Sequence, residues 1–396
     1  MPFGHRNNSY KYGGFRQYRP VQQTHGHDYN KFEAPPPPPS RSVFDFTLEQ
    51  GNLAGAKTAK SDLVFAKEIV ERAANLTPSP EVRSQIKQYA QKVIVALEKE
   101  HRENTLPEVG VTRIMHVGSF VTGTSTHLSD KSDVVVQLKC LPSFETLLIL
   151  GNKIVENMQA ADPSETGVAL PTEDGCIISS HNKQVRVLVT INPLDSVKLE
   201  PELHLDETRM MINHFSLRHV SWLTEMTECI PKETVQEYHA LIRVLKDVRS
   251  RFRGLQPLSV WALQFLAFHC LFDGPNRQKT NLGTAFRRFF ELISAGIFLP
   301  KAAGLMDPTA PNHRIGFDLT FEQMDEVCIA AQTLIRVFAT GDDGYRAILG
   351  TKGTAADLTK TTFVWNGITI EPSETAYEDG CYDQPPSADA DKIPVV

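Results

Sequence analysis

The sequence lacks the features of a membrane, secreted or zinc-binding protein. Its 396 residues contain no apolar run near the ~18 residues of a membrane span, and no apolar core of a secretory signal near the N-terminus. Its six cysteines form no C-x-x-C pair, which argues against a disulfide framework and a zinc site. We therefore expect a globular intracellular protein with reduced thiols and no membrane partner.

Positive charge is also scarce in the part of the chain that we expect to fold. The net charge is −6, of which residues 1–40 contribute +3, residues 371–396 contribute −6, and the stretch between them −3. The part of the chain that we expect to fold therefore lacks the excess positive charge that would bind polyanions. A sequence-specific DNA-binding factor fits poorly, because neither a basic recognition helix nor a zinc finger is present.

Both ends of the chain are predicted to be disordered. Residues 1–40 form a basic arm rich in Tyr and Gly that ends in five consecutive prolines, with too few aliphatic residues for a core. Arg and Tyr interleaved with Gly could stack on single-stranded bases, but a solubilising tail explains the composition equally well. Residues 371–396 form an acidic tail.

The middle of the chain carries most of a phosphoryl-transfer motif. A predicted strand over 111–117 ends at Gly118 and Ser119, and a second predicted strand over 133–138 begins with Asp133. A Gly-Ser pair followed by a strand with Asp-x-Asp is typical of a nucleotidyltransferase palm. The two carboxylates would share one face of the strand, because strand side chains alternate, and would hold Mg²⁺ against a triphosphate.

Two of the three expected carboxylates are missing. Val135 stands where the second Asp of the motif would be, and the neighbouring strand predicted over 184–191 has Arg186 as its only charge. Each lost metal ligand should cost on the order of 10²-fold in rate. We therefore predict a pseudo-nucleotidyltransferase with no catalytic residues and no required cofactor or metal. The alternative is an active template-free nucleotidyltransferase with an unusual metal site that recruits Asp130 or an acid from the second domain.

The pattern of apolar residues predicts an α+β fold. Residues 41–200 are predicted to form the palm, with helices over 61–74, 79–97 and 143–158 and further strands over 176–180 and 184–191. Residues 201–350 are predicted to form an all-helical second domain. Its helices are expected from 231 to 248, 258 to 272, 284 to 298 and 321 to 338, and residues 351–370 are predicted to hold a strand that returns to the palm.

A protein that has lost its catalytic activity can still bind a nucleotide. The candidate residues are Gly118, Ser119, Asp133 and Lys246, which could hold a residual nucleoside triphosphate with one Mg²⁺. Lys246 belongs to a predicted helical row with Arg243 and Arg253. A solvated helix face explains that row better than a phosphate site does, on the residues alone.

An aromatic stripe in the second domain has two interpretations. At helical spacing, such residues usually pack in a core, but a partner interface would look the same, because obligate interfaces resemble a core cut in half. The candidates for a dimer interface are Phe286, Phe289, Phe290, Ile293 and Phe298.

Several segments together resemble the DZF domain of dsRNA-associated nuclear factors. They are residues 150–156, 162–165, 199–206, 245–252, 295–300 and 331–336, within a similarity that runs from about 40 to 380. The resemblance implies a template-free-polymerase fold without activity, in a nuclear protein of RNA metabolism and transcription regulation that can shuttle to the cytoplasm.

The resemblance also implies an obligate heterodimer, formed through the helical domains. The partner would be a second DZF protein with dsRNA-binding domains or zinc fingers: of the interleukin enhancer-binding factor three type, a zinc-finger RNA-binding protein or a spermatid perinuclear RNA-binding protein. RNA would be bound mainly through that partner. The Tyr-, Gln- and Asn-rich arm departs from the Gly- and Arg-rich N-terminus expected in this family, so RNA binding by the arm is not implied.

Overall fold

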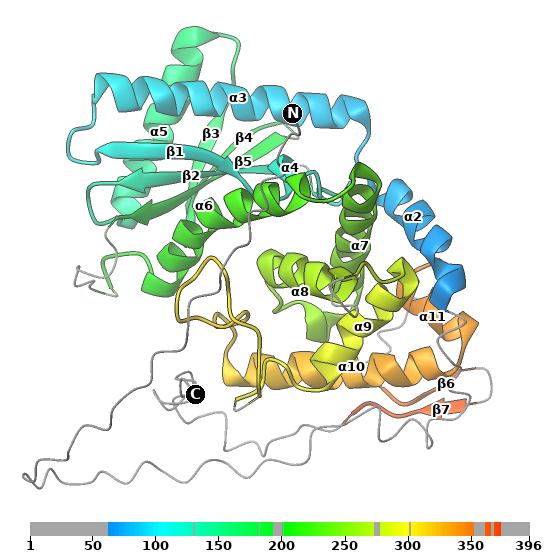
Figure 1. The fold of residues 1–396 in the computed structure, drawn as a ribbon. Coiled ribbons are helices and arrows are strands. Elements are labelled where there is room, and N and C mark those ends of the chain that lie inside the picture. Colours follow the sequence, from blue (N-terminus) through cyan, green and yellow to red (C-terminus); the bar gives the residue numbers. More distant parts are fainter. Residues whose placement is uncertain are drawn as a thin grey trace, which may run out of the picture. The chain divides into compact units, whose positions relative to one another are not determined.

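The computed structural model describes a mixed sheet with its helices and a second, helical part (Figure 1). The described residues are 62–129, 131–181, 183–192, 200, 202–272, 278–300, 302–351, 361–365 and 368–373. The N-terminal arm, Asp130 and the acidic tail beyond residue 373 lie outside this set. No helix within it is long and apolar enough to span a membrane.

Five strands form the palm sheet in the order β1-β2-β5-β4-β3. The strands β2 and β5 run parallel, and the other neighbouring pairs are antiparallel. The bounds are β1 (Val111–Val117), β2 (Lys131–Leu138), β3 (Val168–Thr172), β4 (Gly175–Ser180) and β5 (Lys183–Ile191). The predicted strands are all present, and β3, which was not predicted, adds an edge.

The apolar run in β2 is explained by helices on both faces of the sheet. Val134 and Val136 pack with apolar residues of α3 (Pro80–Glu103) and α5 (Phe144–Ala161), whereas Val135 packs with residues of α6 (Glu207–Glu228). All three valines are fully buried. Alternation along the strand therefore sends consecutive side chains into two different apolar layers, as Figure 1 shows for the helices on either side.

The palm helices begin where their capping residues predict. The Ser79 hydroxyl accepts a hydrogen bond from the Val82 N–H at 3.3 Å, with Pro80 in the first turn of α3. The Ser143 hydroxyl accepts one from the Thr146 N–H at 3.2 Å at the start of α5. These caps satisfy backbone donors that a helix start otherwise leaves unpaired.

The helical part has its own core. It contains α7 (Lys232–Arg251), α8 (Val260–Phe272), α9 (Leu282–Ser294), α10 (Phe321–Ala339) and α11 (Asp342–Leu349), together with α2 (Phe65–Leu76) and the short turns η1 (Asp62–Val64) and η2 (Arg253–Leu255). The α2 helix precedes the palm in the sequence, but Phe65, Ile69 and Ala73 are buried in this core. Conversely, α6 lies within residues 201–350 yet packs on the palm sheet. A helical stripe predicts burial but does not identify the layer that buries it.

The aromatic stripe of α9 and the turn after it packs in this core, as the first of its two interpretations expects. Phe286, Phe289, Phe290 and Ile293 are at most 1% exposed, and Phe298 is 6% exposed. Phe286 and Phe290 contact the ring of Phe338 on α10, with centroids 5.9 and 5.4 Å apart. A side chain that is buried within its own chain is not available to a partner, and the stripe therefore stabilises the fold.

The C-terminal strand does not return to the palm. The strands β6 (Phe363–Trp365) and β7 (Ile368–Ile370) pair with each other in a separate two-stranded sheet. Ile370 is 2% exposed and belongs to the helical core. The alternation along 362–370 predicts strands correctly, but strand pairing depends on tertiary contacts that the alternation does not contain.

Candidate functional site

The Gly-Ser turn lies directly against Asp133. After β1 the chain enters the single turn α4 (Gly118–Val121), where Gly118 adopts a φ of +79°. A Cβ at this position would stand 2.5 Å from Oδ2 of Asp133. Glycine is therefore required twice, by the backbone conformation and by the close approach of the carboxylate.

Asp133 is bound by an arginine from the next strand. Arg186 on β5 is its register partner, and its Nε donates to Asp133 Oδ1 at 2.7 Å. The side chains are 15% exposed for Asp133 and 35% for Arg186. Burial by itself would lower the pKa of Arg186, but the hydrogen bond and charge of Asp133 raise it overall. The only carboxylate of the motif in β2 is thus neutralised within the fold.

The second ligand position is part of an apolar cluster. Val135 packs with Val117 of β1 and with Leu217 and Val220 of α6, and it is fully buried. A carboxylate at this position would lose its hydration and gain no hydrogen-bond partner from these neighbours. The packing therefore fits valine and does not fit a metal ligand.

Two cations of α7 hold the loop that follows Ser119. Lys246 Nζ donates to Ser119 Oγ at 2.6 Å and to the Thr124 carbonyl at 2.9 Å. The guanidinium of Arg243 donates to the carbonyl oxygens of Gly123 and Ser125 at 2.6 and 3.2 Å. A solvated helix face is therefore the wrong interpretation for these two cations, whereas Arg253 is exposed.

Burial changes the protonation of Lys246. Loss of hydration, together with the nearby charges of Arg249 and Arg243, lowers the pKa of Lys246 to about 7. The amine is half-protonated near neutral pH and already contacts a hydroxyl and a carbonyl oxygen. The structure thus brings together the four candidate nucleotide residues, Gly118, Ser119, Asp133 and Lys246. Sequence reasoning missed that Arg186 is the partner of Asp133.

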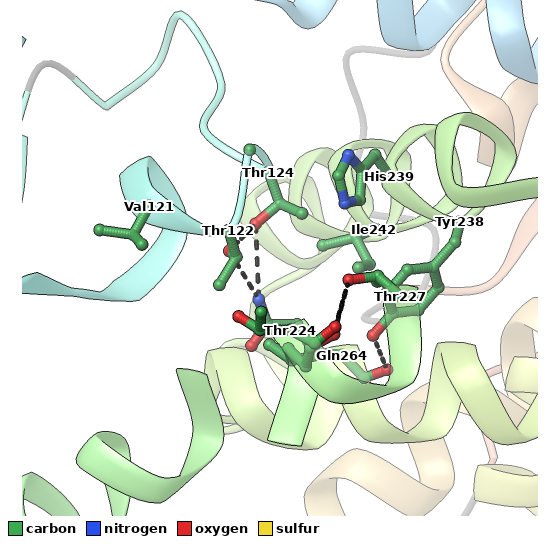
Figure 2. Close-up of a pocket in the computed structure, with 11 residues that line it drawn as sticks. Val121, Thr122, Thr124, Thr224, Thr227, Tyr238, His239, Ile242 and Gln264 are labelled. Carbon is green, nitrogen blue, oxygen red and sulfur yellow. Dashed lines mark hydrogen bonds between the residues drawn. The ribbon is translucent and has the colours of Figure 1, made fainter. Parts of the chain in front are cut away.

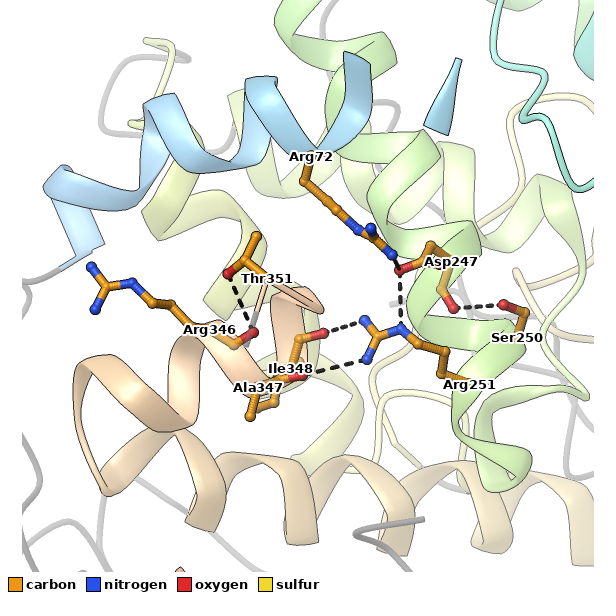
Figure 3. A network of polar contacts seen from close by, with 8 residues as sticks. All are labelled: Arg72, Asp247, Ser250, Arg251, Arg346, Ala347, Ile348 and Thr351. Atoms are coloured by element: carbon orange, nitrogen blue, oxygen red, sulfur yellow. Dashed lines mark hydrogen bonds and ion pairs between the residues drawn. The ribbon is translucent and has the colours of Figure 1, made fainter. Parts of the chain in front are cut away.

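A polar network below the site fixes the orientation of α7 (Figure 3). The buried carboxylate of Asp247 accepts hydrogen bonds from Arg72 of α2 and Arg251 of α7, each at 3.0 Å. Arg251 also donates to the carbonyl oxygens of Ala347 and Ile348 in α11. Asp247 follows Lys246 in sequence, so the network that joins the three helices also sets the position of the lysine.

The donor set does not fit the two Mg²⁺ ions of phosphoryl transfer. Among the described residues there is no group of three or more His, Cys, Asp or Glu side chains that could hold a metal ion. Asp133 is engaged by Arg186, and the second position is a buried valine. A metal here would have to displace an internal cation and would gain one carboxylate ligand from the motif.

Comparison with protein families identifies the chain. A model of the DZF N-terminal domain matches residues 25–228, which is more than half of the chain, and a model of the DZF C-terminal domain matches residues 237–371. The chain belongs to the DZF domain family. The boundary between the two DZF domains falls after α6, which agrees with the packing of α6 on the palm sheet.

The fold of this DZF protein is similar to that of solved structures. The CdnC chain of the E. coli MS115-1 CdnC:HORMA-deltaN complex is 15% identical over 73% of this chain and 97% of its own length, with a TM-score of 0.50. The Cid1 poly(U) polymerase is 11% identical over 72% of this chain and 97% of its own, with a TM-score of 0.47. The DZF protein has a nucleotidyltransferase fold with a mixed sheet and a helical C-terminal part, as the α+β prediction stated.

Proposed function

We propose that this DZF protein is a catalytically inactive nucleotidyltransferase-fold subunit. The ion pair between Asp133 and Arg186 carries the proposal. Catalysis would need a metal at Asp133, and the guanidinium of Arg186 is bound there instead. Val135 supports it, since its apolar surroundings remove the second ligand. Any nucleoside triphosphate with Mg²⁺ held at Ser119 and Lys246 would be a residual ligand and not a substrate.

A primer-extension assay tests the loss of catalysis. The full chain is incubated with labelled triphosphates, Mg²⁺ or Mn²⁺ and an RNA primer, beside its Asp133→Ala variant. We expect no extension by either protein. Extension that Asp133→Ala abolishes would instead establish the second candidate, an active template-free nucleotidyltransferase. Extension that persists in the variant would point to a contaminating enzyme, which a heat-treated sample and a fresh preparation identify.

We further propose that the chain acts as a heterodimer partner. Membership of the DZF family supports a complex with a second DZF protein that carries dsRNA-binding domains or zinc fingers and supplies most of the RNA affinity. The helical part remains the proposed docking region, but not through the buried stripe of α9. Within the family, we propose an invertebrate counterpart of interleukin enhancer-binding factor two, the forty-five-kilodalton nuclear factor, which the chain resembles also in its Asp133-x-Val135 pattern.

Size-exclusion chromatography with light scattering tests the partnership. The chain is prepared alone and coexpressed with a dsRNA-binding DZF protein. We expect the isolated chain to be poorly soluble or homodimeric, and a stable one-to-one complex to form on coexpression and bind dsRNA. A well-behaved monomer that ignores the partner at micromolar concentration would contradict the proposal.

The cellular role follows from the partnership. We propose that the protein acts in the nucleus, with shuttling to the cytoplasm, in RNA metabolism and transcription regulation. Imaging of the tagged chain with and without its partner tests this, and an exclusively cytoplasmic signal in both conditions would contradict it.

A further inference from the structure

The connection between α2 and α3 carries the two Ser/Thr-Pro dipeptides of the chain. They are Thr77-Pro78 and Ser79-Pro80, and no other serine or threonine in the sequence precedes a proline. The connection runs from α2, which packs in the helical core, to α3, which packs in the core of the palm. A proline directly after the acceptor hydroxyl is the main requirement of proline-directed protein kinases, so both hydroxyls are candidates for phosphorylation.

Ser79 is accessible, and the first turns of α3 bury no side chain. Its backbone is extended, with φ −61° and ψ 153°, and its hydroxyl accepts a hydrogen bond from the Val82 N–H. All residues from 79 to 85 are exposed, and Ile86 is the first buried side chain of α3. A kinase binds its substrate in an extended form, so these turns must open. Opening breaks backbone hydrogen bonds but exposes no apolar core, as at any fraying helix end.

Thr77 is less accessible than Ser79. Its hydroxyl donates to the Ala73 carbonyl at 2.8 Å, and its side chain is half-buried. The proline that follows it, Pro78, is buried. Phosphorylation of Thr77 would therefore need Pro78 to leave the core, whereas Ser79 is followed by exposed Pro80. The same dipeptide motif thus predicts modification at one of its two positions.

The start of the connection is anchored to the loop that follows the Gly-Ser turn. Leu76 is 1% exposed, and its carbonyl accepts a hydrogen bond from the His127 N–H at 2.8 Å. The same loop is bound to α8, because the amide of Gln264 donates to the hydroxyls of Thr122 and Thr124 (Figure 2). The chain is therefore fixed up to Pro78 and open from Ser79 onward.

Arg83 is placed to hold a phosphate on Ser79. It follows Ser79 by four positions, so the two side chains lie on the same side of the helix start. Its guanidinium lies 5.9 Å from the ring centroid of Phe120 and forms no ion pair within the described part of the chain. The positive end of the α3 dipole and the Val82 N–H favour an anion at the same place. Glu81 in the first turn repels it, and the guanidinium offsets that repulsion.

We propose that Ser79 is the acceptor of a proline-directed Ser/Thr kinase, and that its phosphate is then bound by Arg83 and the Val82 N–H. In the transfer, the Ser79 hydroxyl oxygen forms a bond to the γ-phosphorus of ATP, and the bond from that phosphorus to the β–γ bridging oxygen breaks. ADP leaves, and the hydroxyl proton passes to the catalytic carboxylate of the kinase. The modification adds about −1.5 to −2 charges to the connection between the two cores.

Mass spectrometry of the full chain after incubation with a proline-directed kinase, ATP and Mg²⁺ tests the acceptor. We expect one phosphate per chain, on Ser79. Ser79→Asn keeps a favoured N-cap but has no hydroxyl, so it should abolish incorporation without loss of the fold. Thr77→Val is the matched control and should be phosphorylated like the wild type, whereas Pro80→Ala should slow the reaction at least tenfold.

A synthetic peptide of residues 70–88 shows how the kinase acts on the same segment without the fold. We expect the peptide and the folded chain both to be phosphorylated on Ser79. Phosphate on Thr77 of the folded chain would overturn the proposal, as would an unchanged rate in Pro80→Ala. Phosphorylation of the peptide alone would mean that the fold shields Ser79, and no phosphorylation of either would mean that the motif is not a substrate. Both results would also overturn the proposal.

Phosphorus NMR of the phosphorylated chain tests the place of the phosphate. The second pKa of phosphoserine is near ~6, and a neighbouring positive charge lowers it. Arg83→Gln should raise the pKa of the phosphate by about 0.2–0.7, the equivalent of one exposed ion pair, and Glu81→Gln should lower it. The control is Arg102→Gln, an exposed arginine 19 positions further along α3. An unchanged pKa in Arg83→Gln, or an equal rise in Arg102→Gln, would overturn the binding of the phosphate by Arg83.

Discussion

The network around Asp247 gives the sharpest test of how the helical part is held together. Asp247 is 4% exposed, and two arginines that are each about a quarter exposed donate to the same oxygen of its carboxylate. Asp247→Ala removes the only acidic partner that Arg72 and Arg251 have among the described residues, and it leaves both guanidinium groups largely buried. Arg251 keeps its carbonyl acceptors in α11, whereas Arg72 loses its ion pair.

The expected cost lies between two limits. Removal of one partner from a fully buried ion pair costs about 3–5 kcal/mol, and removal from an exposed pair at most about 1 kcal/mol. Because the arginines retain partial contact with water, we expect the free energy of unfolding to fall by about 2–3 kcal/mol. At about 2–4 °C per kcal/mol, the melting temperature should fall by roughly 4–12 °C.

Urea denaturation followed by circular dichroism measures this difference. Glu71→Ala is a matched control, since Glu71 pairs with Lys67 on α2 at 3.6 Å while both side chains are largely exposed. Glu71→Ala should lower the free energy of unfolding by no more than about 0.5 kcal/mol. If Asp247→Ala destabilised the protein no more than Glu71→Ala does, the network would be incidental and the reasoning from burial would fail.

Three further predictions address the other structural features. Gly118→Ala should destabilise the protein by about 1–3 kcal/mol, because the new Cβ would meet Asp133 and the backbone has a positive φ. Thermal unfolding measures this change, and an unchanged stability would contradict the close approach. Phe290→Ala should cost about 3–5 kcal/mol in the isolated chain, whereas a side chain that only docked a partner would cost little. The wild type should gain stability relative to Lys246→Met between pH 7 and 10, because the lowered pKa of Lys246 means that this residue binds more protons in the unfolded chain within that window. Urea titrations of both proteins at each pH measure this gain, and a constant difference between them would assign the pH dependence to other groups.

The local features of the fold could be read from the sequence. Ser79 and Pro80 predict the start of α3 because capping depends on neighbours within four residues. The apolar run at Val134 to Val136 indicates a strand, and the structure shows this strand covered on both faces. The missing ligand at Val135 is also visible in the sequence, since the motif spacing places it two residues after Asp133.

What could not be predicted depends on contacts between distant residues. Arg186 lies 53 positions after Asp133, and only the parallel register of β2 and β5 makes them partners. The stripe at Phe290 has the same periodicity whether its neighbours belong to the same chain or to another. For the same reason, the stripe of α2 did not reveal that this helix packs in the helical part.

The ion pair of Asp133 implies that one substitution cannot restore a metal site. Val135→Asp alone would place a carboxylate in an apolar cluster and leave Arg186 bound to Asp133. Arg186→Asp alone would free Asp133 and supply an acid on β5, but would leave valine at the second position. Only the double variant offers three carboxylates on adjacent strands, the number that two-metal phosphoryl transfer requires in palms of this kind.

Thermal unfolding with and without Mg²⁺ tests this argument. A ligand that binds only the folded state at 100 times its Kd stabilises by about 2.7 kcal/mol. We expect that Mg²⁺ raises the melting temperature of the double variant, starting from a less stable protein, and leaves the wild type and both single variants unchanged. A comparable rise in the melting temperature of Val135→Asp would mean that the metal displaces Arg186 from Asp133. The arginine would then be a replaceable neighbour of Asp133, and the loss of catalysis would rest on valine alone.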